Sequence, residues 1–191
     1  MNTEILVITD RSGSMASIAT DVIGGYNRFI DDQRSLPGEA RVTYTQFDTE
    51  YEVIYAGTAL KKVPVLDDKT FVPRGGTALL DAIGRTLNEQ GARIAKEGWA
   101  ELVIVLIVTD GEENSSREYD RARIKEMTSH AESNGWKFVY LGANQDAFSV
   151  ARGLGFSTAH TQGYDATSAG TQVAYGIATA SVGHLRAQPK P

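Results

Sequence analysis

Two uninterrupted apolar runs limit the folds open to this chain more than any other feature. The runs are ILVI at residues 5–8 and LVIVLIV at residues 102–108. Short apolar runs without alternation are typical of strands buried on both faces, as in a parallel sheet covered by helices. Between the two runs, residues 18–35 and 78–96 carry apolar side chains at helical spacing. The pattern therefore predicts an α/β fold.

A β-hairpin marks one edge of the predicted sheet. RVTYTQFD at residues 41–48 and YEVIYAGTAL at residues 51–60 are separated by a very short turn, so they pair antiparallel. The same kinds of pattern predict four further elements: strands at 137–144 and 155–161, and helices at 119–133 and 167–185. We expect a doubly wound, mostly parallel six-stranded sheet with one antiparallel edge strand at residues 51–59 and helices on both faces.

The length of the chain is that of one domain. At 191 residues it can bury a single good core. We assign residues 1–186 to this domain and expect residues 187–191 to form a disordered tail. Residues 61–76 contain two prolines and two glycines and show no clear period. They predict a long loop, and long ordered loops usually carry function.

Composition excludes several classes of function. The net charge of -5 and the absence of a basic run argue against nucleic-acid binding. The chain has no cysteine for a disulfide or a thiolate metal site, and its apolar runs are too short to cross a bilayer. The N-terminus lacks the basic region of a signal peptide. We therefore expect no nucleic-acid or membrane partner, and a cytoplasmic location, or a virion if the chain is encoded by a phage.

Two predicted strands end in the same dipeptide. The first apolar run continues into VITD and ends at Asp10, and the second ends in IVTD at Asp110. With strand order 3-2-1-4, these strands are neighbours at the switch point, where ligands bind at the carboxyl ends. Asp10 and Asp110 should face each other, and two carboxylates with no cation between them repel. Ser12 and Ser14 add neutral oxygens at alternate positions, so the set predicts a site for a hard ion such as Mg²⁺.

The residues of this set carry a family resemblance. Residues 10–14 match the D-x-S-x-S signature of the von Willebrand factor A domain, or integrin I-type domain, which the chain resembles over roughly residues 3–185. Thr77 in PRGGTALLDAIG and Asp110 in IVTDGEEN match two more elements of that family, in the family's order. The resemblance implies a metal-ion-dependent adhesion site (MIDAS) with five contributing residues: hydroxyls from Ser12, Ser14 and Thr77, and carboxylates from Asp10 and Asp110.

The resemblance also implies a function. The ion would be Mg²⁺, with Mn²⁺ or Ca²⁺ as alternatives, and an Asp or Glu of a partner protein would complete its shell. Three hydroxyls are neutral, so two aspartates only balance the ion and leave it able to attract a third carboxylate. Without cysteine or a signal peptide, and with its stretch from ANQDAF onward, the chain looks more like bacterial or phage intracellular members than like extracellular adhesion members. We interpret it as a metal-dependent protein–protein interaction module. The sequence specifies neither its partner nor its oligomeric state.

Two alternatives to this interpretation stay open. One is a structural assembly subunit, in a phage particle or bacterial complex, with an idle site. The other is a Mg²⁺-dependent phosphohydrolase, but dehalogenase-type phosphatases carry a second Asp where this chain has Ser12. Neither a P-loop nor a GxSxG elbow occurs in the sequence. We therefore expect the chain not to be an enzyme.

Other polar residues near the predicted site have less specific roles. Asp48 lies in a hairpin turn, where Asp is common, and we leave it out of the metal shell. We expect Thr77 to be exposed on its loop. The histidines lack metal-ligand spacing, and we expect surface or capping positions for them: His130, His160 and His184. We expect solvated loop positions at the rim of the site for eight more residues: Arg11, Met15, Arg74, Glu112, Glu113, Asn114, Asn144 and Gln145.

Overall fold

The computed structural model describes residues 1–144 and 146–188. Within them, one sheet has the strand order β3-β2-β1-β4-β5-β6, and only β3 runs antiparallel. The strands have these bounds: β1 Thr3–Asp10, β2 Ala40–Phe47, β3 Tyr51–Ala59, β4 Leu102–Thr109, β5 Lys137–Ala143 and β6 Thr161–Tyr164. The predicted doubly wound sheet with one antiparallel edge strand is confirmed.

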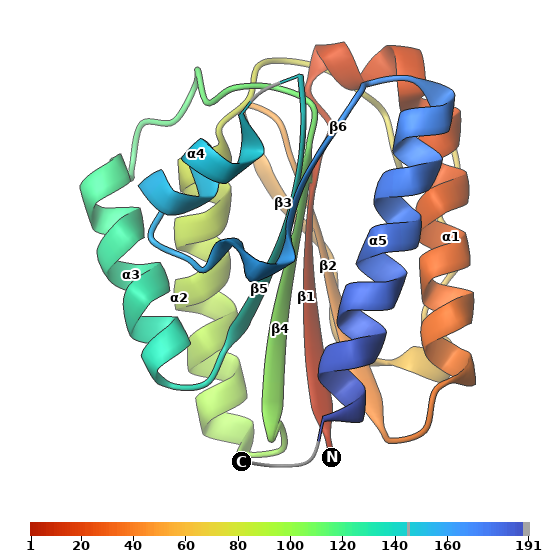
Figure 1. Ribbon diagram of the computed structural model, residues 1–191, viewed down its shortest axis with the longest axis vertical. Helices are drawn as coiled ribbons and strands as arrows, with labels where there is room; N and C mark the ends of the chain where they lie inside the picture. The colour runs from red at the N-terminus through yellow and green to blue at the C-terminus, as the bar shows by residue number, and fades with distance from the viewer. Residues whose placement is uncertain (145, 189–191) are drawn as a thin grey trace.

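Helices cover both faces of the sheet (Figure 1). The α-helices have these bounds: α1 Ala19–Ser35, α2 Leu79–Glu97, α3 Arg121–Ser133, α4 Ala147–Gly153 and α5 Ser168–Ala187. Three short 3-10 helices complete the described elements: η1 Gly13–Ile18, η2 Leu60–Lys62 and η3 Thr158–His160. Helices α1 and α5 pack on one face, and α2, α3 and α4 pack on the other.

Strand β1 separates two hydrophobic cores. Its residues Ile5 and Val7 point to the core under α1 and α5, while Leu6 and Ile8 point to the core under α2, α3 and α4. Every residue of β1 and β4 is buried, because successive side chains alternate between two covered faces. This double burial is what the uninterrupted apolar runs predicted.

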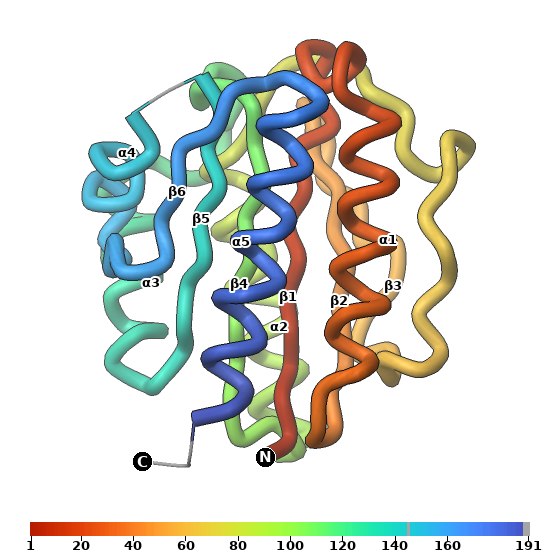
Figure 2. Tube along the Cα trace, turned by 45° about the vertical axis from the view of Figure 1, so that its right-hand side comes forward, coloured from red at the N-terminus to blue at the C-terminus, as the bar shows by residue number. Residues whose placement is uncertain are grey.

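Strands β1 and β4 pair in parallel at the centre of the sheet, with Thr9 level with Val108. Their carboxyl ends therefore reach the same edge, which is the upper edge in Figures 1 and 2. The strand order reverses between these two strands, as it does at the ligand-binding crevice of other doubly wound sheets.

The predicted long loop is ordered. No α-helix or strand occurs between Lys62 and Leu79, and the segment runs beside α1 to the upper edge (Figure 2). Asn27 of α1 donates to the carbonyl of Leu66 at 2.9 Å and accepts from its N–H at 2.8 Å. Phe71 is buried in the core under α1. The loop is thus fixed at its middle, and it delivers Thr77 to the edge where β1 and β4 end.

The C-terminal third differs from expectation in three places. The sixth strand occupies Thr161–Tyr164, later than the predicted 155–161, of which 158–160 are a 3-10 helix. Helix α4 was not predicted, because only seven residues give little helical period. Helix α5 continues to Ala187, and the rest of the expected tail beyond Gln188 lies outside the described residues. Within the described residues, none of the helices has both the length and the apolar character to cross a membrane.

Candidate metal-binding site

Three chain segments bring the five predicted residues to one edge of the sheet. Asp10 ends β1, Ser12 follows in the turn, and Ser14 lies at the start of η1. Asp110 directly follows β4, and Thr77 lies two residues before α2. Asp10, Ser12, Asp110 and Thr77 are all buried, whereas Ser14 is exposed. The group therefore opens to solvent on its Ser14 side.

The polar atoms of this group contact one another directly. The Ser14 hydroxyl donates to Oδ1 of Asp110 at 2.7 Å and lies 3.1 Å from the Ser12 hydroxyl. Asp10 accepts from the Ser12 N–H at 2.7 Å through Oδ1 and from the Thr109 hydroxyl at 2.6 Å through Oδ2. The oxygens from the β1 turn and from the end of β4 thus meet at one point, as the strand order predicted.

Thr77 reaches the same point across Gly111. A Cβ added at Gly111 would lie 3.3 Å from Oγ1 of Thr77 and 3.9 Å from Oγ of Ser14. A glycine here leaves a small space flanked by the two hydroxyls. The Thr77 backbone is held by Asn114, whose Oδ1 accepts from the Thr77 N–H at 2.9 Å and whose N–H donates to the Thr77 carbonyl at 3.0 Å. Thr77 is 2% exposed, so the expected exposed position is wrong.

Burial makes the two carboxyl groups resist ionisation. Burial raises the pKa of Asp10 to about 6, and hydrogen bonds from Thr109 and Ser12 offset only part of this effect, to which the charge of Asp110 adds. Burial likewise raises the pKa of Asp110, against the hydrogen bond from Ser14. Among the described residues, no Arg or Lys forms an ion pair with either carboxyl. A bound cation would remove the cost of placing two negative charges together.

The donor set fits a hard divalent ion. Two carboxylates and three hydroxyls are oxygen ligands of the kind that Mg²⁺ and Ca²⁺ prefer. No group of three or more His, Cys, Asp or Glu in the described part of the chain could hold a metal. A metal at this edge would therefore depend on the serine and threonine hydroxyls as much as on the aspartates.

Several neighbours expected to be solvated are structural instead. Arg11 is 4% exposed and Met15 is fully buried, because both side chains turn inward from the β1 turn. Glu113 accepts from the N–H of Leu80 at 2.9 Å in the first turn of α2. Asn144 is exposed, as expected, and takes the position after β5 with a positive φ of 53°.

The remaining rim residues and two of the histidines differ in their exposure and contacts. Glu112 is exposed, as expected. Arg74 is 53% exposed but pairs with Asp48 and Glu50, so it is not merely solvated. His130 and His184 form exposed side-chain contacts on helices α3 and α5. Gln145 lies outside the described residues.

Asp48 has a role that its place in a turn did not reveal. Its side chain is 1% exposed and pairs with Arg11 and Arg74. Burial would raise the pKa of Asp48, but hydrogen bonds from the Glu50 N–H, Arg74 and Arg11 outweigh burial and hold the pKa below its ordinary value. Asp48 is therefore ionised and anchors two arginines beside the site.

Comparisons with known proteins identify the fold. The sequence matches no model of a known protein family and no curated protein sequence. Solved structures match over most of the chain. The mussel byssus protein PTMP1, in a structure with a zinc-occupied MIDAS motif, is 15% identical over 94% of this chain and 46% of its own, with a TM-score of 0.66. A von Willebrand factor type A protein from Catenulispora acidiphila is 18% identical over 94% of this chain and 42% of its own, with a TM-score of 0.61.

This chain has the fold of a von Willebrand factor A domain. The manganese-loaded TRAP protein of Plasmodium vivax shares it, at 18% identity over 74% of this chain and 57% of its own, with a TM-score of 0.53. Identities this low establish the fold alone. The chain spans about half the length of these von Willebrand factor A relatives. Two of the three carry a divalent ion, zinc in PTMP1 and manganese in TRAP.

Proposed function

We propose that this chain is a protein-interaction module that captures a carboxylate of a partner protein through a divalent ion held by Asp10, Ser12, Ser14, Thr77 and Asp110. One observation carries the proposal. The ends of β1 and β4 and the loop before α2 bring two buried carboxyls and three hydroxyls together, and no basic side chain of the described residues pairs with those carboxyls. A buried carboxylate that stays charged is normally paired with a base or coordinates a metal.

The residues divide the work of holding an ion. Asp10 and Asp110 would supply the two negative charges, and the hydroxyls of Ser12, Ser14 and Thr77 would supply neutral oxygens. When bound, a divalent ion would bring positive charge and a coordination position for an outside carboxylate. Ser14 is exposed, so a partner would approach from its side. The oxygen-only donor set favours Mg²⁺, with Mn²⁺ or Ca²⁺ as alternatives.

We propose binding without turnover. Phosphoryl transfer by an aspartate of the dehalogenase type uses an acid or base two positions after the nucleophile. The residue two positions after Asp10 is Ser12, and its N–H already donates to that carboxyl at 2.7 Å. The mussel byssus protein PTMP1, which is named as a thread matrix protein, supports an interaction role for the fold in general. A bacterial or phage origin and a cytoplasmic or virion location remain expectations of the sequence.

The test compares the wild type with Thr77→Val and Thr77→Ser. Valine keeps the branched shape and removes the hydroxyl, whereas serine keeps the hydroxyl. We expect calorimetric titration with Mg²⁺ or Mn²⁺ to show binding to the wild type and to Thr77→Ser, and at least tenfold weaker binding to Thr77→Val. Thr77→Val should fold normally, because the hydrogen bonds that hold residue 77 to Asn114 are made by its backbone.

Partner capture then tests the second half of the proposal. The three proteins are immobilised and exposed to extract of the source cells in Mg²⁺, then washed with chelator. We expect the wild type and Thr77→Ser to release a specific protein on chelation and Thr77→Val to retain none. Retention of the same protein by all three, unaffected by chelator, would refute metal-dependent capture and favour an assembly subunit with an idle site.

A further inference from the structure

We propose that Asp48 is a positioning residue for the candidate metal site: through Arg11 and Arg74 it fixes the loop that carries Thr77 against the turn that carries Ser12 and Ser14. The inference rests on the proposed function, because it assigns to Asp48 the assembly of that same site. Asp48 lies in the β2–β3 turn, and its carboxylate binds groups outside the proposed metal shell: the Arg11 and Arg74 side chains and the Glu50 N–H.

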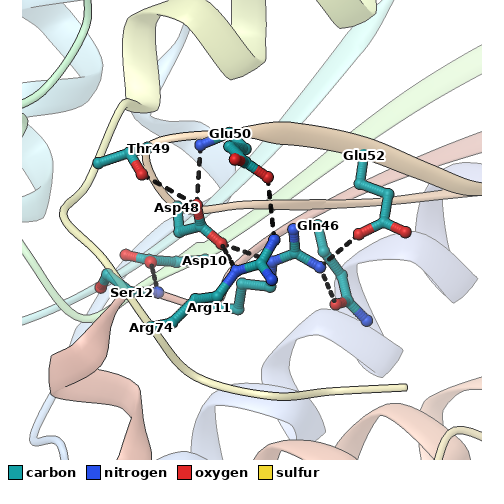
Figure 3. Close-up of polar contacts among 9 residues, drawn as sticks. All are labelled: Asp10, Arg11, Ser12, Gln46, Asp48, Thr49, Glu50, Glu52 and Arg74. Carbon is teal, nitrogen blue, oxygen red and sulfur yellow. Dashed lines mark hydrogen bonds and ion pairs between the residues drawn. The ribbon is translucent and has the colours of Figure 1, made fainter. Parts of the chain in front are cut away.

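One carboxylate oxygen of Asp48 joins two loops (Figure 3). Its Oδ2 accepts from Nε of Arg11 at 2.8 Å and from Nε of Arg74 at 3.0 Å. Arg11 stands between Asp10 and Ser12 in the β1 turn, and Arg74 stands three residues before Thr77. The other oxygen of Asp48 accepts from the Glu50 N–H at 2.8 Å, which fixes the carboxylate within its own turn. The hairpin thus acts as a rigid support for both arginines.

Backbone hydrogen bonds follow the same connections. The Arg74 N–H donates to the Arg11 carbonyl at 2.7 Å, and the Ala78 N–H donates to the Asp48 carbonyl at 3.0 Å. Thr77 lies between these two attachments. Gly75 has a φ of 66°, and a Cβ there would lie 3.0 Å from Oγ1 of Thr49. The loop therefore bends tightly around the Asp48 turn before it presents Thr77.

Charge explains why an acid is needed at this position. The Arg11 side chain is 5% exposed and begins next to Asp10, so its guanidinium would repel a divalent ion unless an anion neutralised it. Asp48 is buried together with Arg11. The half-exposed Glu52 pairs with Nη1 of Arg11 at 2.6 Å. Asp48 thus neutralises the buried guanidinium of Arg11, which would otherwise stand unpaired beside the candidate metal site. Asparagine would preserve the shape and lose this neutralisation.

The experiment measures the affinity for Mn²⁺ alone, by calorimetric titration well below the melting temperature. Removing a group that orients metal ligands typically weakens metal binding by roughly 10 to 100-fold. We expect a loss in that range for Asp48→Asn and about tenfold for Arg74→Gln. Arg123→Gln is the matched control, because Arg123 is also an ion-paired arginine, with 55% of its side chain exposed against 53% for Arg74, and lies on helix α3. It should bind Mn²⁺ as the wild type does.

A second readout separates positioning from stability. If Asp48 only stabilises the hairpin, Asp48→Asn lowers the melting temperature in metal-free buffer and leaves the Mn²⁺ affinity of the folded protein unchanged. That result, or unchanged affinity in Arg74→Gln, overturns the inference. Arg74→Gln covers the case in which Asp48→Asn does not fold, because Arg74 is half exposed. If the wild type itself binds no Mn²⁺, the proposed function fails first and the positioning role fails with it.

Discussion

Asp10→Asn should make the metal-free protein more stable at neutral pH. Burial holds the pKa of Asp10 at about 6, against an ordinary value of 3.8. Between these values the folded state binds more protons than the unfolded state, so stability falls as the pH rises through this window. Above it the full cost is present, about 3 kcal/mol for a shift of about two units. Asparagine removes the charge but still buries a polar group, so we expect a gain of about 1–3 kcal/mol.

The assay is urea unfolding of the wild type and Asp10→Asn in metal-free buffer, at a pH of about 7.5 and again at about 4. Asp10→Asn should have the larger free energy of unfolding at the higher pH. The difference should largely close at the lower pH, where the folded wild type is already protonated. Asp31→Asn is the control: that side chain is 69% exposed, so its removal should change little at either pH.

Adding Mg²⁺ should reverse the order of the two proteins. An ion that binds only the folded state stabilises it by about 4.1 kcal/mol at a thousandfold excess over Kd, which exceeds the expected lead of the variant. The wild type should gain this amount and Asp10→Asn very little. The reasoning fails if Asp10→Asn is the less stable protein in metal-free buffer by the same amount at both pH values, since Asp10 would then stabilise the fold without any cation.

Two further predictions concern the loop that carries Thr77 and the absence of phosphatase activity. Gly76→Ala places a Cβ 2.3 Å from Oγ of Ser115 and 2.9 Å from Oδ1 of Asn114. It should destabilise the protein by about 1–3 kcal/mol in urea unfolding and weaken Mg²⁺ binding. Gly176→Ala is the control and should do neither, because its Cβ would meet nothing within 4 Å. Hydrolysis of p-nitrophenyl phosphate in Mg²⁺ should be no faster for the wild type than for Asp10→Asn, and a clear difference between them would contradict the proposal of binding without turnover.

The strands and their order were predictable because a buried strand requires a recognisable local pattern of apolar residues. Strands β1 and β4 are buried on both faces, and each therefore needs a continuous apolar run. The short turn at Asp48 could only join antiparallel strands. Once β1 and β4 are neighbours, the meeting of Asp10 and Asp110 follows from geometry. Helix α4 and strand β6 were missed or displaced because seven and four residues carry too little periodicity to register.

The side-chain network around the site was not predictable in the same way. Arg11 was expected to be solvated, because a charged residue in a turn normally is. Its burial depends on Asp48, 37 positions away in sequence, and on Glu52 across the hairpin. The sequence around Arg11 or around Asp48 contains no pattern that indicates their ion pair. Asn114 is similar, since its amide holds Thr77 from a different loop. Such partners become visible only when the tertiary structure places the loops together.

The two halves of the candidate site should therefore respond differently to mutation. The carboxyls of Asp10 and Asp110 are placed by the pairing of β1 and β4, which is fixed by the core on both faces of the sheet. The hydroxyl of Thr77 is placed by a loop that Asp48 and Asn114 hold from either side. Changes to the strand-ending acids alter stability and metal binding together, because the acids bear the buried charge. Changes to the loop supports alter the distance between hydroxyls and carboxyls, so metal affinity can vary on this fold while its core stays the same.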